Sequence, residues 1–260
     1  MYECARMRDV RLFIMALRFV KPFFYGEISM KALVLFSGGL DSSVCLGLAV
    51  KKHGAGEVLA LSIYYGQKHK KEMEASEQIA SRYGVRRITL DLGEIFKDSD
   101  CTLLEGAREE IPHEEYAEQL KKTGGGPVNT YVPFRNGLFL SAAASIALAN
   151  GCTEIYYGAH ADDAAGNAYP DTSVAFNKAI SEAIYVGSGE ELRIVAPFID
   201  KTKAQVVAVG AELGVPFELT WSCYEGQKKA CGVCGTCRDR IAAFRLNGME
   251  DPIEYEDERN

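Results

Sequence analysis

Residues 37–43, Ser-Gly-Gly-Leu-Asp-Ser-Ser, constrain the fold of this chain more than any other stretch. Residues 32–36 before them form a short apolar run typical of a buried strand, and residues 44–50 after them continue as an apolar helix. Gly38 and Gly39 allow a sharp turn that brings backbone N–H groups close to an anion. The start of the helix adds unpaired N–H groups and the positive end of a dipole. Strand, glycine turn and helix in this order predict a phosphate-binding site.

The side chains of this loop limit which type of phosphate-binding site it can form. Ser37, Ser42 and Ser43 supply hydroxyl donors, and Asp41 is a candidate both for the helix cap and for a magnesium ligand. The loop lacks the Gly-Lys-Ser/Thr ending of a Walker loop, and its spacing does not fit the dinucleotide fingerprint. The alternative is a Gly-Ser turn between a core strand and a helix that binds nothing, because both residues are common in turns.

The loop resembles the PP-loop of the N-type ATP pyrophosphatases. In that superfamily the loop holds the pyrophosphate that leaves when ATP is cleaved to AMP. The resemblance implies the following nucleotide-binding residues: Phe36, Ser37, Gly38, Gly39, Leu40, Asp41, Ser42, Ser43, Val44, Cys45 and Leu46.

Composition and charge exclude several classes of protein. The chain has 260 residues, which is enough for one large α/β domain with a small appendage. Its formal net charge of -7 argues against a dominant nucleic-acid surface, and no apolar run is long enough to span a bilayer. Four of the eight cysteines cluster near the C-terminus, which predicts a metal site in a reducing compartment rather than a disulfide scaffold. We therefore expect a cytoplasmic protein without a membrane partner.

The remaining pattern alternates strands and helices. We expect strands at 58–64, 87–92, 154–159 and 193–198, and helices at 70–83, 137–149, 172–185 and 203–213, the last capped by Thr202. This alternation predicts an α/β fold with a doubly wound, parallel, five-stranded sheet that binds ligands beyond the carboxyl ends of its strands. We expect an N-terminal extension at 1–29 ahead of a natural start at Met30, and an ATP-binding domain at 30–215. A cysteine segment with a closing helix follows at 216–250, and a mobile acidic tail at 251–260.

Several polar residues fall at the predicted ligand edge. Tyr65 and Gln67 follow the second strand, where they face the adenine or the second substrate, or simply form a strand-end turn. Arg135 precedes a helix at the same edge and is either a phosphate clamp, which we favour, or a surface salt-bridge partner. Lys203 opens its helix where a leaving pyrophosphate would be met.

The loop that follows the predicted fourth strand is rich in acidic residues. Asp162, Asp163 and Asp171 are placed to bind magnesium or the N–H groups of a base. The alternative is a solvated, turn-rich loop with Asp171 near a helix cap.

Four cysteines in one short segment give the second strong signal: Cys223, Cys231, Cys234 and Cys237. Glycines between them allow the tight turns that aim sulfurs inward, and four thiolates around one tetrahedral ion form a structural zinc site. Part of an iron–sulfur run and a redox Cys-x-x-Cys pair are the alternatives. Zinc is the favoured interpretation.

Together the two motifs resemble the 7-cyano-7-deazaguanine synthase family. The resemblance covers about residues 31–246, and the loop at 160–167 departs from the family pattern. The stretches that carry it are residues 36–43, 65–69, 133–136 and 169–171 and the four cysteines.

The resemblance implies a ligase that forms carbon–nitrogen bonds, converting 7-carboxy-7-deazaguanine, ATP and ammonia to the 7-nitrile through adenylated intermediates. The product feeds queuosine in bacteria and archaeosine in archaea. The implied cofactors are ATP, Mg²⁺ and one Zn²⁺ per subunit, and the implied assembly is a homodimer that acts on small molecules and does not bind nucleic acid. The implied site residues are Asp41, Arg135 and Lys203 for catalysis and Tyr65, Gln67, Asp163, Tyr169 and Asp171 for the substrate.

Two other functions fit parts of the sequence. A PP-loop enzyme that thiolates tRNA would need a catalytic cysteine or cluster and usually a basic RNA-binding surface, which the net charge disfavours. A non-enzymatic zinc-ribbon binding module would use lysines such as Lys228 and Lys229, but it would leave the ATP loop unexplained.

Overall fold

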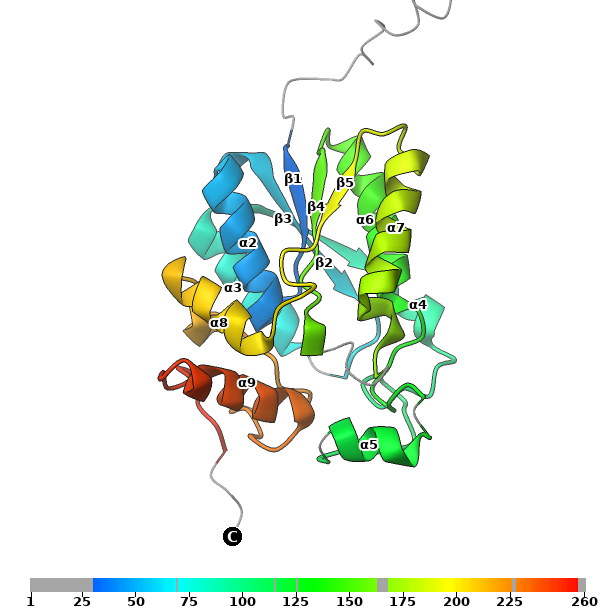
Figure 1. Cartoon of the computed structure of the whole chain (residues 1–260), viewed down its shortest axis with the longest axis vertical. Helices are drawn as coiled ribbons and strands as arrows, with labels where there is room; N and C mark the ends of the chain where they lie inside the picture. The colour runs from blue at the N-terminus through cyan, green and yellow to red at the C-terminus, as the bar shows by residue number, and fades with distance from the viewer. Residues whose placement is uncertain are drawn as a thin grey trace, which may run out of the picture.

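The computed structural model describes residues 30–68, 70–114, 116–124, 126–162, 168–225 and 228–256. A five-stranded parallel sheet lies at the centre of the chain, with strand order β3-β2-β1-β4-β5 (Figure 1). The strands are β1 (Ala32–Leu35), β2 (Val58–Tyr64), β3 (Arg86–Asp91), β4 (Glu154–Tyr156) and β5 (Arg193–Val195).

Helices cover both faces of the sheet (Figure 1). On one face lie α2 (Leu40–His53), α3 (Lys71–Tyr83) and α8 (Lys203–Glu212), and on the other α6 (Arg135–Ala149) and α7 (Val174–Gly187). At the end of the sheet toward which β1 runs lie α5 (Tyr116–Lys122) and α9 (Gly235–Leu246), and α4 (Gly93–Phe96) follows β3. Three short 3-10 turns complete the elements: η1 (Ala55–Glu57), η3 (Pro170–Thr172) and η4 (Phe217–Leu219).

Strand β1 contributes to both hydrophobic layers because its side chains alternate between the faces. Ala32 and Val34 pack toward α2, α3 and α8, while Leu33 packs toward α6 and α7. All three are fully buried, as expected for a central parallel strand with helices on both sides. The doubly wound parallel sheet predicted from the sequence is confirmed.

The strand order creates a crevice beside β1. The chain passes from β1 through α2 to β2 on one side, and returns later to add β4 on the other side. The connection after β1 therefore runs to one side of the crevice and the connection after β4 runs to the other side. Open α/β sheets bind ligands at such switch points. Strands β4 and β5 end at Tyr156 and Val195, earlier than expected, and the chain beyond β4 leaves the sheet to line this crevice.

The C-terminal segment is fixed by a buried ion pair that the sequence did not predict. The Arg240 side chain is fully buried, and its guanidinium donates to both carboxylate oxygens of Asp251, at 2.7 and 3.0 Å. It also donates to the hydroxyl of Thr220 at 2.7 Å and to the carbonyl of Phe217 at 3.1 Å. Residues 251–256 of the predicted acidic tail pack on the cysteine segment through Asp251 and the Ala230–Glu254 backbone hydrogen bond.

The predicted capping of α8 is confirmed. The Thr202 hydroxyl accepts from the N–H of Gln205, and the Gln205 side chain accepts from the N–H of Thr202. None of the helices in the described ranges is long and apolar enough to cross a membrane.

Candidate active site and cysteine cluster

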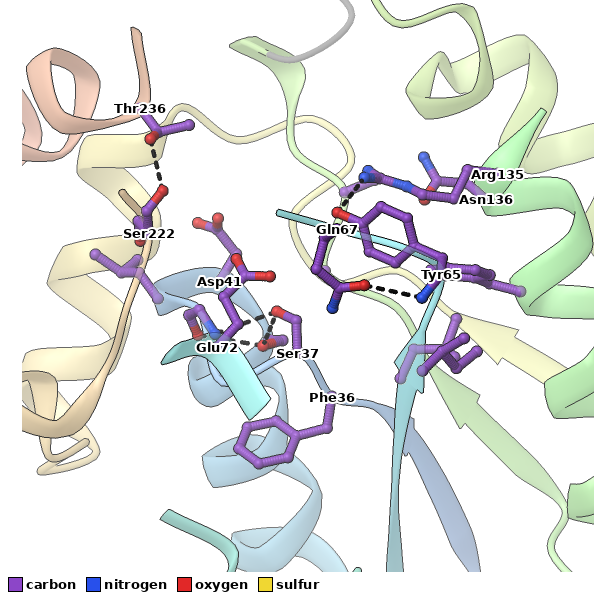
Figure 2. A pocket seen from close by; sticks show the side chains of 18 of the residues that line it. Phe36, Ser37, Asp41, Tyr65, Gln67, Glu72, Arg135, Asn136, Ser222 and Thr236 are labelled. Atoms are coloured by element: carbon purple, nitrogen blue, oxygen red, sulfur yellow. Dashed lines mark hydrogen bonds between the residues drawn. The ribbon is translucent and has the colours of Figure 1, made fainter. Parts of the chain in front are cut away.

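A pocket lies at the carboxyl ends of β1, β2 and β4, at the switch point of the sheet (Figure 2). Its lining combines apolar side chains from the strands and their ends with polar groups from the surrounding loops and helix starts. The strands contribute Leu35, Leu61 and Ile63, and Tyr157 follows directly after β4. The polar lining includes Ser37, Asp41, Tyr65, Gln67, Glu72, Arg135, Tyr169, Lys203, Ser222 and Thr236.

The PP-loop takes the sharp turn that its glycines predict. Gly38 has a φ of +88°, and a Cβ atom there would lie 2.5 Å from the backbone oxygen of Glu72 and from the backbone nitrogen of Ser76. Only glycine allows this close approach of the loop to α3. The N-cap of α2 is Gly39, with no side-chain hydrogen bond, so the expectation that Asp41 caps the helix is wrong.

Serine side chains hold the loop in shape. The Ser37 hydroxyl accepts from the N–H of Gly39 at 3.1 Å and lies 3.1 Å from the Ser42 hydroxyl. Ser43 donates to the carbonyl of Gly39 at 2.8 Å. The N–H groups of the first turn of α2 have no partners within the helix and lie at the positive end of its dipole, so this turn can accept a phosphate.

Asp41 lies in the first turn of α2 and is paired with Lys203. The Lys203 ammonium donates to Asp41 Oδ2 at 2.8 Å, and His160 Nε2 lies 3.8 Å from the same oxygen. Burial alone would raise the pKa of Asp41, but the charge of the Lys203 ammonium and its hydrogen bond to Asp41 help to hold the pKa below its ordinary value. Asp41 Oδ1 is buried, and the described residues offer it no hydrogen-bond partner.

Arg135 is the first residue of α6 and lies over an aromatic surface (Figure 2). Its guanidinium carbon is 5.1 Å from the centre of the Tyr65 ring, and it donates to the Tyr65 hydroxyl at 3.2 Å. Burial alone would lower the pKa of Arg135, but the acidic groups around it, chiefly Tyr65 and Asp171, outweigh burial and raise the pKa. Burial raises the pKa of Tyr65 to about 12. A permanent positive charge therefore faces the pocket at the end of β2.

The structure brings most of the predicted site residues together. Asp41, Arg135, Lys203, Tyr65, Gln67 and Tyr169 all line the pocket. Gln67 is nearly fully buried and accepts from the backbone N–H of Tyr65 at 2.8 Å, while the Tyr169 hydroxyl lies 2.6 Å from that of Thr130.

Several other predicted residues do not line the pocket or fall outside the described residues. Val44, Cys45 and Leu46 are fully buried in the core under α8 and do not line the pocket. Asp171 is buried behind the pocket, where its carboxylate accepts from the N–H of Asn136 at 2.8 Å in the first turn of α6, and burial raises its pKa. It supports the helix that carries Arg135 instead of facing the pocket. Asp163 lies outside the described residues.

Sequence reasoning missed one wall of the pocket. Ser222, Tyr224 and Thr236 come from the cysteine segment, and the Thr236 hydroxyl donates to the Ser222 carbonyl at 2.6 Å. Glu72, in the first turn of α3, was missed as well. The only sequence signal was the nearness of Ser222 and Thr236 to the cysteines, because contacts between distant segments leave no periodic pattern.

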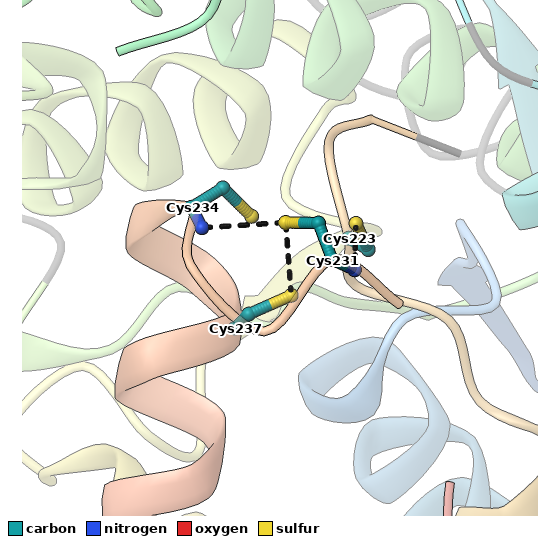
Figure 3. A group of neighbouring side chains, drawn as sticks. All are labelled: Cys223, Cys231, Cys234 and Cys237. Carbon is teal, nitrogen blue, oxygen red and sulfur yellow. Dashed lines mark hydrogen bonds between the residues drawn. The ribbon is translucent and has the colours of Figure 1, made fainter. Parts of the chain in front are cut away.

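The four predicted cysteines converge on one point (Figure 3). The sulfur atoms of Cys223, Cys231, Cys234 and Cys237 all lie within 4.8 Å of one another, and all four residues are buried. Backbone N–H groups of Cys231 and Cys234 donate to sulfur at 3.3 Å, and Cys234 and Cys237 belong to the N-terminal turn of α9. These donors and the helix dipole favour thiolates. Four buried, converging thiolates fit a soft or borderline metal ion.

Comparison with protein families agrees with this geometry. The family model described as "Queuosine biosynthesis protein QueC" matches residues 31–248, nearly all of the described chain. The chain belongs to the QueC family.

Relatives named 7-cyano-7-deazaguanine synthase match this QueC-family chain over almost its whole length. The protein from Archaeoglobus fulgidus is 42% identical over 230 residues, which are 88% of this chain and 92% of the relative. The protein from Thermoplasma acidophilum is 43% identical over 232 residues, covering 87% and 92%. The protein from Caldicellulosiruptor bescii is 40% identical over 227 residues, covering 87% and 98%.

Among solved structures, NMN synthetase from Francisella tularensis gives a TM-score of 0.44 at 15% identity over 86% of this chain and 79% of that chain. This likeness is too weak to support an argument about fold or function.

Proposed function

We propose that this chain is an enzyme that converts 7-carboxy-7-deazaguanine, ATP and ammonia to 7-cyano-7-deazaguanine, the activity by which its relatives are named. The observation that carries the proposal is the shared pocket. A PP-loop, the Asp41–Lys203 pair and the Arg135–Tyr65 pair all line it. The family assignment favours this activity over tRNA thiolation and over a non-enzymatic zinc-ribbon module.

The first proposed step activates a poor electrophile. An oxygen of the substrate carboxylate attacks the α-phosphorus of ATP, the bond to the β-phosphate oxygen breaks, and an acyl adenylate and pyrophosphate form. Lys203 and the N–H groups at the start of α2 stabilise the charge that develops on the leaving pyrophosphate. Arg135, whose positive charge faces the pocket, binds the carboxylate or a phosphate oxygen and orients it.

The second and third steps build the nitrile. Ammonia attacks the acyl carbon, AMP leaves, and one proton is released to give the amide. The amide oxygen then attacks the α-phosphorus of a second ATP, a second pyrophosphate leaves, and release of one amide proton gives an imidate adenylate. Loss of AMP and of the remaining proton on nitrogen leaves the nitrile. The apolar side chains of Leu61, Ile63 and Phe139 line the pocket and limit the access of water to both adenylates.

The residues present fit a magnesium ion. Asp41 Oδ1 is a buried carboxylate oxygen in the pocket wall, and hard oxygen donors are what Mg²⁺ prefers. We propose that Asp41 holds Mg²⁺, which would neutralise phosphate charge when bound.

We propose that the four cysteines hold one zinc ion with a structural role. Their donor set suits zinc, and the segment they fold contributes Ser222, Tyr224 and Thr236 to the pocket wall. Metal analysis together with the visible absorbance spectrum distinguishes zinc from an iron–sulfur cluster. A homodimer and a cytoplasmic location stay predictions, which sedimentation velocity and cell fractionation would check.

The proposed function is tested by product analysis. The protein is incubated with ATP, Mg²⁺ and ammonia, with and without 7-carboxy-7-deazaguanine, and AMP, pyrophosphate and the base are measured by mass spectrometry. We expect AMP release that depends on the acid and a product with the mass of the nitrile. A metal-loaded protein that binds ATP but makes no nitrile would overturn the proposal, and tRNA would then be tested as the substrate.

A further inference from the structure

His160 lies behind the phosphate side of the pocket, just beyond the end of β4. It is 2% exposed and does not line the pocket itself. Its Nε2 atom is 3.4 Å from Lys203 Nζ and 3.8 Å from Asp41 Oδ2. His160 therefore touches both members of the ion pair that faces the nucleotide, although no step of the proposed reaction uses it.

Backbone hydrogen bonds fix His160 relative to Lys203. The N–H of Ala161 donates to the carbonyl of Lys201 at 2.9 Å, and the N–H of Lys203 donates to Asp162 Oδ2 at 2.7 Å. The chain after β4 and the start of α8 are thus joined on both sides of the histidine. One of these bonds joins the two backbones and the other comes from the Asp162 side chain, and together they hold His160 next to Lys203.

The chemistry of the contact determines which form of the imidazole it requires. A lysine ammonium can only donate, so a hydrogen bond from Lys203 requires an unprotonated Nε2, with the proton of the neutral ring on Nδ1. We propose that neutral His160 is a positioning residue for Lys203, and that it directs the ammonium toward the pyrophosphate by accepting one of its hydrogen bonds while Asp41 accepts another.

Two substitutions test the proposal, which rests on the proposed function. In His160→Gln the side-chain amide reaches the position of Nε2 and can still accept from Lys203, whereas in His160→Asn it reaches only the position of Nδ1. Pyrophosphate release is measured at a fixed pH, with kcat and KM for ATP determined separately. Circular dichroism and metal content report whether each variant folds.

We expect His160→Gln to keep kcat/KM for ATP within a few-fold of wild type. His160→Asn should lose about 10- to 100-fold, as expected when a hydrogen bond to a charged group is removed. A His160→Asn variant with the wild-type rate would overturn the proposal. So would a His160→Gln variant that falls as far as His160→Asn.

A measurement on the unmutated chain needs neither turnover nor a folded variant. The chain has four histidines, and ¹⁵N-histidine NMR distinguishes the two neutral tautomers of each. We expect one buried histidine with its proton on Nδ1 at neutral pH, whose signal changes in a Lys203→Met variant. A proton on Nε2 of His160 would overturn the inference even if nitrile synthesis is confirmed. If instead the wild type makes no nitrile, the proposed function fails and the tautomer still tests the contact.

Discussion

The backbone N–H of Trp221 donates a hydrogen bond of 3.0 Å to the carbonyl oxygen of Gly38. This bond joins the cysteine segment directly to the turn of the PP-loop. Lys71 strengthens the junction from α3, since its ammonium lies 4.0 Å from the centre of the Trp221 ring and donates to the carbonyl of Lys228 at 2.7 Å. The metal site and the nucleotide site therefore share a wall, and Trp221 is the single tryptophan of the chain.

Removal of one metal ligand should disturb the nucleotide loop through this junction. We expect Cys237→Ser to lose its metal to a chelator at least tenfold faster than wild type, because a hydroxyl is a poorer ligand than a thiolate. Its Trp221 fluorescence should shift and its ATP affinity should fall. The control is Cys152→Ser, since Cys152 is buried in the core beside α6, away from the cluster. Metal retention in Cys237→Ser equal to that in the control would contradict the predicted ligand set.

Three glycine-to-alanine substitutions separate backbone strain from steric clash. Gly38→Ala combines a φ of +88° with a Cβ 2.5 Å from backbone atoms of α3. Gly84→Ala has a φ of +67° and open space, and Gly56→Ala has open space without a positive φ. We expect Gly56→Ala to be nearly neutral, Gly84→Ala to cost about 1–2 kcal/mol of unfolding free energy, and Gly38→Ala to cost more and abolish ATP binding.

Urea unfolding and nucleotide titration measure these effects. Equal losses in Gly38→Ala and Gly84→Ala would mean that the loop can move away from α3, contrary to the packing described above.

Two arginine–tyrosine pairs of similar geometry allow a matched test of Arg135. Arg193 lies 4.4 Å from the centre of the Tyr185 ring and donates to its hydroxyl at 3.2 Å, but neither residue lines the pocket. We expect Arg135→Lys to lower kcat/KM for nitrile formation about 10- to 100-fold, because an ammonium cannot form the planar, forked contacts of a guanidinium. Arg193→Lys should leave the rate unchanged. Steady-state kinetics of the two variants measure this difference. Equal rates would contradict the prediction that Arg135 binds the substrate.

Tyr65 should make stability depend on pH in the alkaline range. Burial raises its pKa from an ordinary 10.0 to about 12, so between these values the unfolded chain loses the proton and the folded chain keeps it. The unfolded state is then favoured as the pH rises, and wild type should lose about 2–3 kcal/mol relative to Tyr65→Phe across this window. Denaturant unfolding of both proteins at several pH values measures the difference. Tyr185→Phe, at a half-buried tyrosine, is the control, and an identical pH trend in all three proteins would contradict the prediction.

Most of the fold could be predicted from local sequence patterns. The apolar runs at β1 and β2 are buried on both faces, and such strands show as continuous hydrophobic sequence. The glycine turn of the PP-loop and the cap at Thr202 were equally readable, because each depends on the properties of adjacent residues. The spacing of the four cysteines predicted their convergence for the same reason.

The parts that sequence could not predict are contacts between distant segments. Asp171 was predicted to bind the substrate in the pocket. Its carboxylate instead accepts a hydrogen bond from the backbone N–H of Asn136 in the first turn of α6. Arg240 was not singled out from the sequence, yet it is fully buried, and Asp251 and Thr220 accept hydrogen bonds from its guanidinium. Neither residue belongs to a repeating pattern, and only the tertiary arrangement determines its role.

The Arg240–Asp251 pair sets the order in which the enzyme can be completed during its synthesis. The PP-loop at the start of the sheet leaves the ribosome early, but the wall formed by Ser222 and Thr236 depends on α9, which Asp251 fixes in place. Asp251 follows α9 in the sequence and therefore emerges from the ribosome after it. A nascent chain can therefore form its PP-loop well before all walls of the pocket are in place. Premature termination after α9 would give a product without Asp251, the residue that holds α9 in position.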